Sequence, residues 1–83
     1  MNQILVKVYS PTIEKSYDVL IPVNKKVYNV ILLLVKAINE LNDNSFIKTY
    51  MPSLYNKYTG NAYDPQLTVR ENKIANGTEI III

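Results

Sequence analysis

The sequence predicts an α+β fold, a mixed sheet of four to five strands packed on one helix in the chain order ββαββ. Two stretches near the start alternate apolar and polar residues, which is the period of half-buried strands. A stretch with the period of an amphipathic helix follows, and four isoleucines close the sequence. With 83 residues the chain has the length of one domain, and we expect residues 1–83 to form it.

We expect the first two strands, residues 3–9 and 16–22, to form a hairpin. Residues 10–16 between them hold Pro11 among polar side chains, which indicates a loop longer than a two-residue turn. Pro22 has no backbone N–H and ends the second strand. The alternation gives each strand two faces. The first strand has Ile4, Val6 and Val8 on one face and Leu5, Lys7 and Tyr9 on the other. The second strand has Tyr17, Val19 and Ile21 on one face and Asp18 and Leu20 on the other.

Residues 24–42 are the expected helix, and Asn24 is its expected N-cap because its side-chain oxygen can accept from the first free N–H groups. The residues expected on the core side are Val27, Val30, Ile31, Leu34, Ala37, Ile38 and Leu41. Leu32 lies on the opposite, polar side, which favours an interface role. Tyr28 and Val35 on one flank have two interpretations: they belong to such an interface, or the apolar loop after the helix folds back over them.

That loop, residues 46–51, is expected to tuck under the edge of the domain or to cover the helix flank. Its apolar residues are Phe46, Ile47, Tyr50 and Met51. A strand at residues 54–60 and a short one at residues 61–65 should follow. Residues 67–77 indicate a short helical or 3₁₀ turn. Two of its apolar residues are expected in the core, Val69 and Ile74.

The last expected strand, residues 78–83, starts from a turn at Asn76-Gly77, a pair that tolerates positive φ. Its isoleucines alternate between two faces, Ile80 and Ile82 on one and Ile81 and Ile83 on the other. A strand that is apolar on both faces is typically central, so we expect this one beside the first strand. Its outward isoleucines then extend an apolar patch that includes Leu5 and Tyr9.

Taken in order, these segments resemble the ubiquitin-like β-grasp superfamily. The opening QILVK is similar to the first strand of ubiquitin, PVNKKVYNV to the proline-then-helix entry of that fold, and VRENKIANGTEI to its segment leading into the last strand. Within the superfamily, the short length, the helix entry at residues 23–27 and the closing I-x-N-G-x-x-I resemble the small bacterial YukD/EsaB-type ubiquitin-like proteins.

That resemblance implies an accessory component of type VII (WXG100/ESX-like) secretion: a cytosolic, non-catalytic protein that binds other components and needs no cofactor. Related domains occur at the cytosolic end of membrane subunits of such systems. Ubiquitin-like modifiers act through a flexible C-terminal diglycine, whereas the two glycines of this sequence, Gly60 and Gly77, both fall at expected turns. We therefore expect neither conjugation nor sulfur transfer.

The composition excludes several kinds of chemistry. Without Cys or His, the chain has no thiolate, no imidazole base and no usual transition-metal ligand. Its carboxylates stand apart in the sequence, so we expect no catalytic pair and no metal site. The start lacks a signal-peptide pattern, and the most apolar stretch, residues 27–35, is too short to span a bilayer. A cytoplasmic protein without direct membrane insertion is expected.

The expected contact surface for protein partners, among them secretion-machinery components, is the outward face of the sheet, with a second surface on the helix. Its candidate residues are Leu5, Tyr9, Tyr55, Ile81 and Ile83, and Leu32 on the helix. An alternative is a self-assembling homo-oligomeric structural subunit, in which the same face closes a homodimer. A nucleic-acid-binding β-grasp domain would use the seven tyrosines for stacking, but the nine basic residues are scattered, so no nucleic-acid partner is expected.

Overall fold

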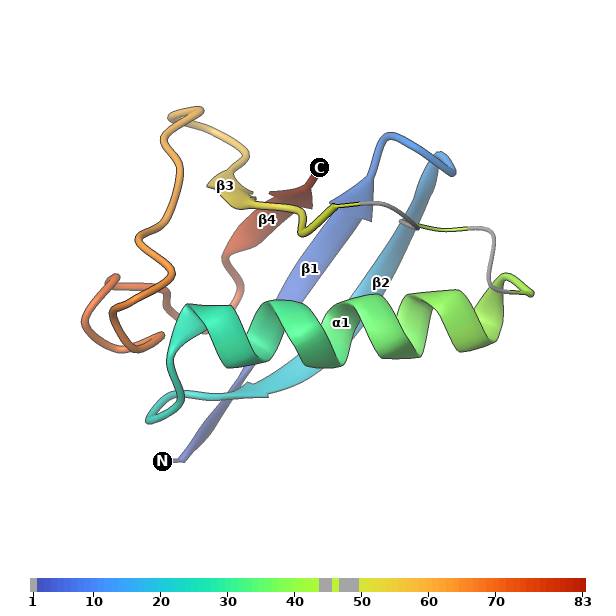
Figure 1. Ribbon diagram of the computed structural model, residues 1–83. Coiled ribbons are helices and arrows are strands. Elements are labelled where there is room, and N and C mark those ends of the chain that lie inside the picture. The colour runs from blue at the N-terminus through green and yellow to red at the C-terminus, as the bar shows by residue number, and fades with distance from the viewer. Residues whose placement is uncertain (1, 44–45, 47–49) are drawn as a thin grey trace.

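The computed structural model describes residues 2–43, 46 and 50–83. Its elements follow in the order β1 (Gln3–Ser10), β2 (Lys15–Pro22), α1 (Val27–Leu41), β3 (Leu54–Asn56) and β4 (Glu79–Ile82). These strands form one sheet in the order β2-β1-β4-β3. β1 pairs antiparallel with β2 and parallel with β4, and β3 pairs antiparallel with β4, so the sheet is mixed. Figure 1 shows α1 lying across one face of this sheet, and the expected α+β fold is confirmed.

β1 and β2 form the expected hairpin, with Val8 opposite Tyr17 near its closed end. Residues 11–14 connect the strands, and Glu14 adopts the left-handed conformation at φ 54°. The connection is therefore longer than a two-residue turn, as the sequence indicates. The fully buried residues of the hairpin strands are Val6, Val8, Ser10 and Ile21.

β4 lies between β1 and β3, as the run of isoleucines predicts. The turn before it contains Gly77 at φ 87°, a conformation that residues with a Cβ rarely adopt. The N–H of Gly77 donates to the carbonyl of Leu5 at 2.7 Å, which fixes the turn to β1. Beyond β4, Ile83 exchanges two backbone hydrogen bonds with Ser53, at 2.9 and 3.1 Å. The last residues of the sequence are thus held in the sheet.

The apolar core lies between the sheet and α1. Its buried residues are Val6, Val8, Ile21, Val23, Val27, Val30, Ile31, Leu34, Ile38, Phe46, Leu54, Val69, Ile74, Ile80 and Ile82. Phe46, from the loop after the helix, is only 2% exposed, so this residue does tuck under the domain. Ile47 lies outside the described residues, and Tyr50 and Met51 are exposed.

The start of α1 differs from the prediction. The helix begins at Val27, and Asn24 is exposed and is not its N-cap. The first N–H groups are satisfied by a loop far along the chain. The N–H of Val27 donates to the carbonyl of Leu67 at 2.9 Å, and the N–H of Tyr28 donates to the carbonyl of Pro65 at 3.0 Å. Because the free N–H groups of a first helical turn need only a well-placed oxygen, backbone carbonyls replace the expected side-chain cap.

The buried face of α1 is narrower than predicted. Five residues of the predicted core side are buried, namely Val27, Val30, Ile31, Leu34 and Ile38. Ala37 is exposed, and Leu41 is 68% exposed. Leu41 is the last residue of the helix, and in Figure 1 this end of α1 extends past β2, where the sheet no longer lies beneath it.

The segment after β3 contains less strand than predicted. β3 spans only Leu54–Asn56, and residues 61–65 contribute one isolated bridge, from Ala62 to Tyr55. Two further backbone hydrogen bonds of 2.9 Å hold this segment along β3, so it covers that margin of the sheet. At the opposite margin, no strand of the described residues lies beyond β2.

Residues 67–77 form successive turns and no 3₁₀ helix. Val69 and Ile74 are 0% and 5% exposed, which confirms their predicted inward position. Asn72 fixes the path of this region, because its side chain accepts from the N–H of Asp64 and donates to the carbonyl of the same residue, both at 2.9 Å. These bonds hold in place the loop whose carbonyls cap α1.

Candidate functional site

The outer face is the side of the sheet that points away from α1. The alternation of side chains along each strand determines which residues lie on the outer face. Val8, Leu54 and Ile80 point into the core, so their neighbours in the sequence point outward. The outer face consists of Leu5, Lys7, Tyr9, Asp18, Leu20, Tyr55, Lys57, Glu79 and Ile81, with Ile83 at its end.

Two apolar rows run across the outer face. Leu5 on β1 lies opposite Leu20 on β2 and forms the first row. Tyr9 on β1 pairs with Ile81 on β4, and Ile81 pairs with Tyr55 on β3, which forms the second row. Leu5 is 45% exposed and Leu20 is 60% exposed, whereas the residues of the second row are half-buried.

A charged row separates the two apolar rows. Lys7 on β1 lies between Asp18 on β2 and Glu79 on β4. Lys57, directly after β3, continues the row, because its Nζ lies 3.2 Å from Oε1 of Glu79 and its backbone N–H donates to the carbonyl of Glu79. In strand order from β2 to β3, the charges of the row are negative, positive, negative and positive.

Glu79 is held as a carboxylate within this row. The hydroxyl of Tyr58 donates a hydrogen bond to Oε2 of Glu79, and Nζ of Lys57 donates to Oε1 at 3.2 Å. These bonds, the Tyr58 bond most, hold the pKa of Glu79 below its ordinary value. The same hydrogen bond raises the pKa of the Tyr58 hydroxyl. Glu79 is therefore a carboxylate at neutral pH.

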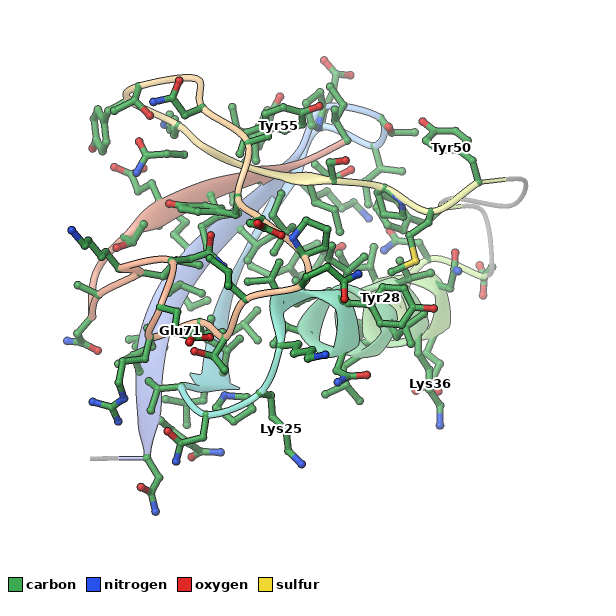
Figure 2. The ribbon with its side chains drawn as sticks, turned by 60° about the vertical axis from the view of Figure 1, so that its left-hand side comes forward. Lys25, Tyr28, Lys36, Tyr50, Tyr55 and Glu71 are labelled. Atoms are coloured by element: carbon green, nitrogen blue, oxygen red, sulfur yellow. The ribbon has the colours of Figure 1, made fainter. Side chains whose placement is uncertain are left out.

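The structure brings most of the sequence-predicted site residues together. Four lie at one end of the outer face, namely Tyr9, Tyr55, Ile81 and Ile83, the last of them 45% exposed. Leu5 shares the face but lies across the charged row. Leu32 lies on α1, on the other side of the sheet, and is 46% exposed. Figure 2 shows this separation, with Tyr55 at the strands and Tyr28 on α1. A contact role for these residues stays a prediction.

A groove of about 390 Å³ runs between α1 and β2. Leu20 and Pro22 line it from the strand, and Leu33, Lys36 and Ala37 line it from the helix. This groove accounts for the exposure of Ala37. The other flank of the helix is covered in part, since Val35 is half-buried while Tyr28 is 44% exposed.

Sequence reasoning misses Leu20 and the charged row. Alternation gives the face of each leucine within its own strand, but only the strand register shows that Leu5 and Leu20 share one face of the sheet and lie opposite each other. Lys57 and Glu79 are distant in the sequence and meet because β3 pairs with β4. The alternating pattern was a usable signal for Leu20, whereas no local pattern marks the charged row.

Within residues 2–43, 46 and 50–83, no three acidic side chains gather closely enough to hold a metal ion. In the same part of the chain, no helix has both the length and the apolar content that crossing a membrane requires.

No protein-family model matches this sequence, and no curated protein matches it. Solved structures do match. The ubiquitin-like domain of EccD5 from Mycobacterium xenopi has a TM-score of 0.79 at 15% identity, covering 100% of this chain and 94% of that chain. The ubiquitin-like domain of the Mycobacterium tuberculosis type VII secretion system protein EccD1 has a TM-score of 0.78 at 10% identity, covering 100% and 99%.

A chain of the MycP5-free ESX-5 inner membrane complex gives a TM-score of 0.80 at 19% identity. The match covers 100% of this chain but only 21% of that chain, so it concerns one part of a longer protein. The fold of the present chain is therefore ubiquitin-like. At these identities the similarity establishes the fold, and function has to be argued from the surface.

Proposed function

We propose that this chain is a bacterial, non-catalytic protein-interaction module, with residues 1–83 forming one ubiquitin-like domain. We further propose that it serves as a cytosolic accessory component of type VII-like secretion, of the YukD/EsaB kind. The similarity to ubiquitin-like domains of type VII secretion proteins supports the second statement. Its protein partners would then be components of the secretion machinery.

The observation that carries the proposal is the uncovered outer face. α1 is the one helix among the described residues, and it packs on the inner face. On the outer face, Leu5, Leu20 and Ile83 are each at least 45% exposed. Covering such a side chain stabilises a complex by about 1–2 kcal/mol. A protein partner that covers both apolar rows would therefore gain affinity from desolvation, with the charged row setting its orientation.

The proposal includes binding without conjugation. Activation of a ubiquitin-like modifier needs a flexible diglycine, and the two glycines of this sequence stand apart in turns, Gly60 at φ 75° and Gly77 at φ 87°. Intact-mass analysis of the protein expressed with its gene neighbours tests this point. A covalent adduct at the C-terminus would contradict it.

Leu5→Asp and Ile81→Asp test the contact surface. The probe is the purified cytosolic region of an FtsK/SpoIIIE-like ATPase of a type VII secretion system, and calorimetry measures the dissociation constant. We expect Leu5→Asp to weaken binding at least about tenfold, since it places a charge in an apolar row. Lys25→Glu, an exposed change away from the outer face, is the matched control. Unchanged affinity in folded Leu5→Asp and Ile81→Asp proteins would overturn the assignment of the outer face.

Leu32 defines the second proposed surface, on α1. Leu32→Asp should weaken a partner that docks on the helix and should leave a partner on the outer face bound. The same calorimetric titration distinguishes the two surfaces.

The outer face does not support the nucleic-acid-binding alternative. A nucleic-acid site concentrates positive charge, whereas the charged row of the outer face alternates in sign. The homodimer alternative, in contrast to the nucleic-acid alternative, is favoured by the charged row.

A further inference from the structure

The charged row is complementary to itself when its order is reversed. From β2 to β3 it runs Asp18, Lys7, Glu79 and Lys57. We propose that the outer face closes on a second copy of this chain, related by a twofold axis that runs along the strands. This inference rests on the proposed function, because both take the outer face to be a contact surface. It names a second copy of the chain as the protein that occupies this surface.

A twofold axis along the strands turns the second sheet over and reverses its strand order, so that β1 faces the second copy's β4. Lys7 then faces the partner's Glu79, and Asp18 faces the partner's Lys57. Because a twofold contact is reciprocal, each of these contacts occurs twice, and every charge in the row meets an opposite charge. Packed sheets lie about 10 Å apart, a gap that extended Lys and Glu side chains can bridge.

The charges also exclude the other way of stacking two outer faces. A twofold axis across the strands would keep the strand order, so that Lys7 would face the partner's Lys7 and Asp18 would face the partner's Asp18. Like charges placed directly opposite each other destabilise a contact. The alternation of the row therefore selects the axis along the strands.

The second apolar row agrees with the same axis. An axis along the strands keeps each residue at its height in the sheet and places β1 over the partner's β4. Tyr9 then meets the partner's Ile81, and Ile81 meets the partner's Tyr9. Leu5 and Leu20 lie on β1 and β2, so they face the partner at the height of the turn before its β4 and do not meet the same leucines of the second copy. The charged row and one apolar row are therefore matched across the expected interface.

The size of the outer face sets the expected strength of the dimer. β1 and β2 span eight residues each, whereas β3 and β4 span three and four. At about 3.3 Å per residue and about 4.8 Å between strands, the outer face measures at most about 25 by 20 Å and is shorter across β3 and β4. Such an area is at the low end for specific interfaces, so the dimer should dissociate on dilution and weaken with salt. α1 lies on the outside of this dimer, which leaves Leu32 open to other proteins.

Two single variants with reversed charges, each purified separately and then mixed, test this arrangement. Lys7→Glu places glutamates face to face across the axis, and Glu79→Lys places lysines there, so each variant alone should be monomeric. In an equimolar mixture, all four charges of one variant face opposite charges of the other, and a heterodimer should form. Sedimentation velocity at low ionic strength, over a concentration series, should show a dimer for the wild type and for the mixture, and a monomer for each single variant alone.

Two controls accompany the mixture. The double variant Lys7→Glu/Glu79→Lys keeps every facing pair opposite and should dimerise like the wild type, although both native side chains are gone. Lys25→Glu lies away from the outer face and should leave sedimentation unchanged. Circular dichroism confirms that each variant is folded.

A wild-type chain that stays monomeric at the highest concentration, or a mixture no larger than its components, overturns the inference. If the wild type is monomeric while Leu5→Asp still weakens binding of the ATPase region, only the inference fails and the proposed function stands. If the mixture dimerises while Leu5→Asp leaves ATPase binding unchanged, the inference stands and the outer face loses its proposed foreign partner.

Discussion

The two faces of the sheet contain the same types of apolar residue and differ in how these are arranged. β4 shows this within a few residues, since Ile80 and Ile82 are 1% and 0% exposed on the inner face while Ile81 is half-buried on the outer face. The inner face is apolar up to Ser10 at the end of β1 and is covered by α1, whereas on the outer face a charged row divides the apolar area. A continuous apolar surface is favourably buried in a core. An apolar surface that charged side chains divide into smaller patches can remain in contact with water until a matching surface covers it. Arrangement rather than apolar content therefore distinguishes the two faces.

The largest expected effect is the difference in stability loss between alanine substitutions at two neighbouring isoleucines of β4. Ile80→Ala should lower the free energy of unfolding by about 3 kcal/mol, because it leaves a cavity in a filled core. Ile81→Ala should lower it by about 1 kcal/mol, because its side chain already contacts water. Urea unfolding followed by circular dichroism measures both values. Equal losses would show that the two faces do not differ in packing.

The turn before β4 decides which isoleucines face the core, and Gly77→Ala should lower the free energy of unfolding by about 1 kcal/mol. The cause is the strained φ of 87°, since an added Cβ would meet no atom within 4 Å. Gly77→Asn is the matched control and should cost less, because Asn tolerates left-handed conformations. Thermal unfolding compares the variants. An alanine variant as stable as the wild type would show that the turn does not depend on positive φ.

Leu20 should behave as a contact residue and not as a core residue. Because it is 60% exposed, Leu20→Ser should change the free energy of unfolding by no more than about 0.5 kcal/mol. The same change should weaken binding of a foreign partner that covers Leu20 on the outer face, measured by calorimetry with the ATPase region. A stability loss as large as that of Ile80→Ala would place Leu20 in the core and contradict the comparison.

The smallest expected effect is the pH dependence that the charged row gives to stability. Folding lowers the pKa of Glu79 from its ordinary value of 4.5, so its carboxylate stabilises the fold above that value, and this contribution is lost as the pH falls through the folded pKa. The wild type should therefore be more stable than Glu79→Gln at pH 7, with the difference vanishing in more acidic solution. The difference should be small, because Tyr58 is 76% exposed. Urea unfolding at several pH values measures it, and a difference that did not change with pH would refute this account.

The sequence suffices for features that a few neighbouring residues determine. The hairpin follows from alternation and from Pro22, and the central position of β4 follows from four isoleucines after Asn76-Gly77. Each of these signals acts through local backbone preference or strand period, so it can be read without knowing the rest of the fold.

Features that depend on distant segments could not be predicted in this way. α1 starts at Val27 because carbonyls of Pro65 and Leu67 reach its first N–H groups, and no pattern around Asn24 indicates that loop. The same distinction holds for the candidate site. Alternation indicates which side chains of a strand share a face, but the register between strands determines which of them are neighbours across the sheet. Lys57 meets Glu79 only once β3 and β4 are paired.

β1 and β4 lie side by side at the centre of the sheet although they are the first and last strands of the sequence. During synthesis on the ribosome, the hairpin and α1 emerge well before β4. Until β4 arrives, β1 has one unpaired side, and the core lacks Ile80 and Ile82. Such a nascent intermediate exposes a strand edge and apolar surface together, the two features that make partly folded chains aggregate. The growing chain should therefore require shielding by a chaperone, and the requirement should end when the final strand is inserted.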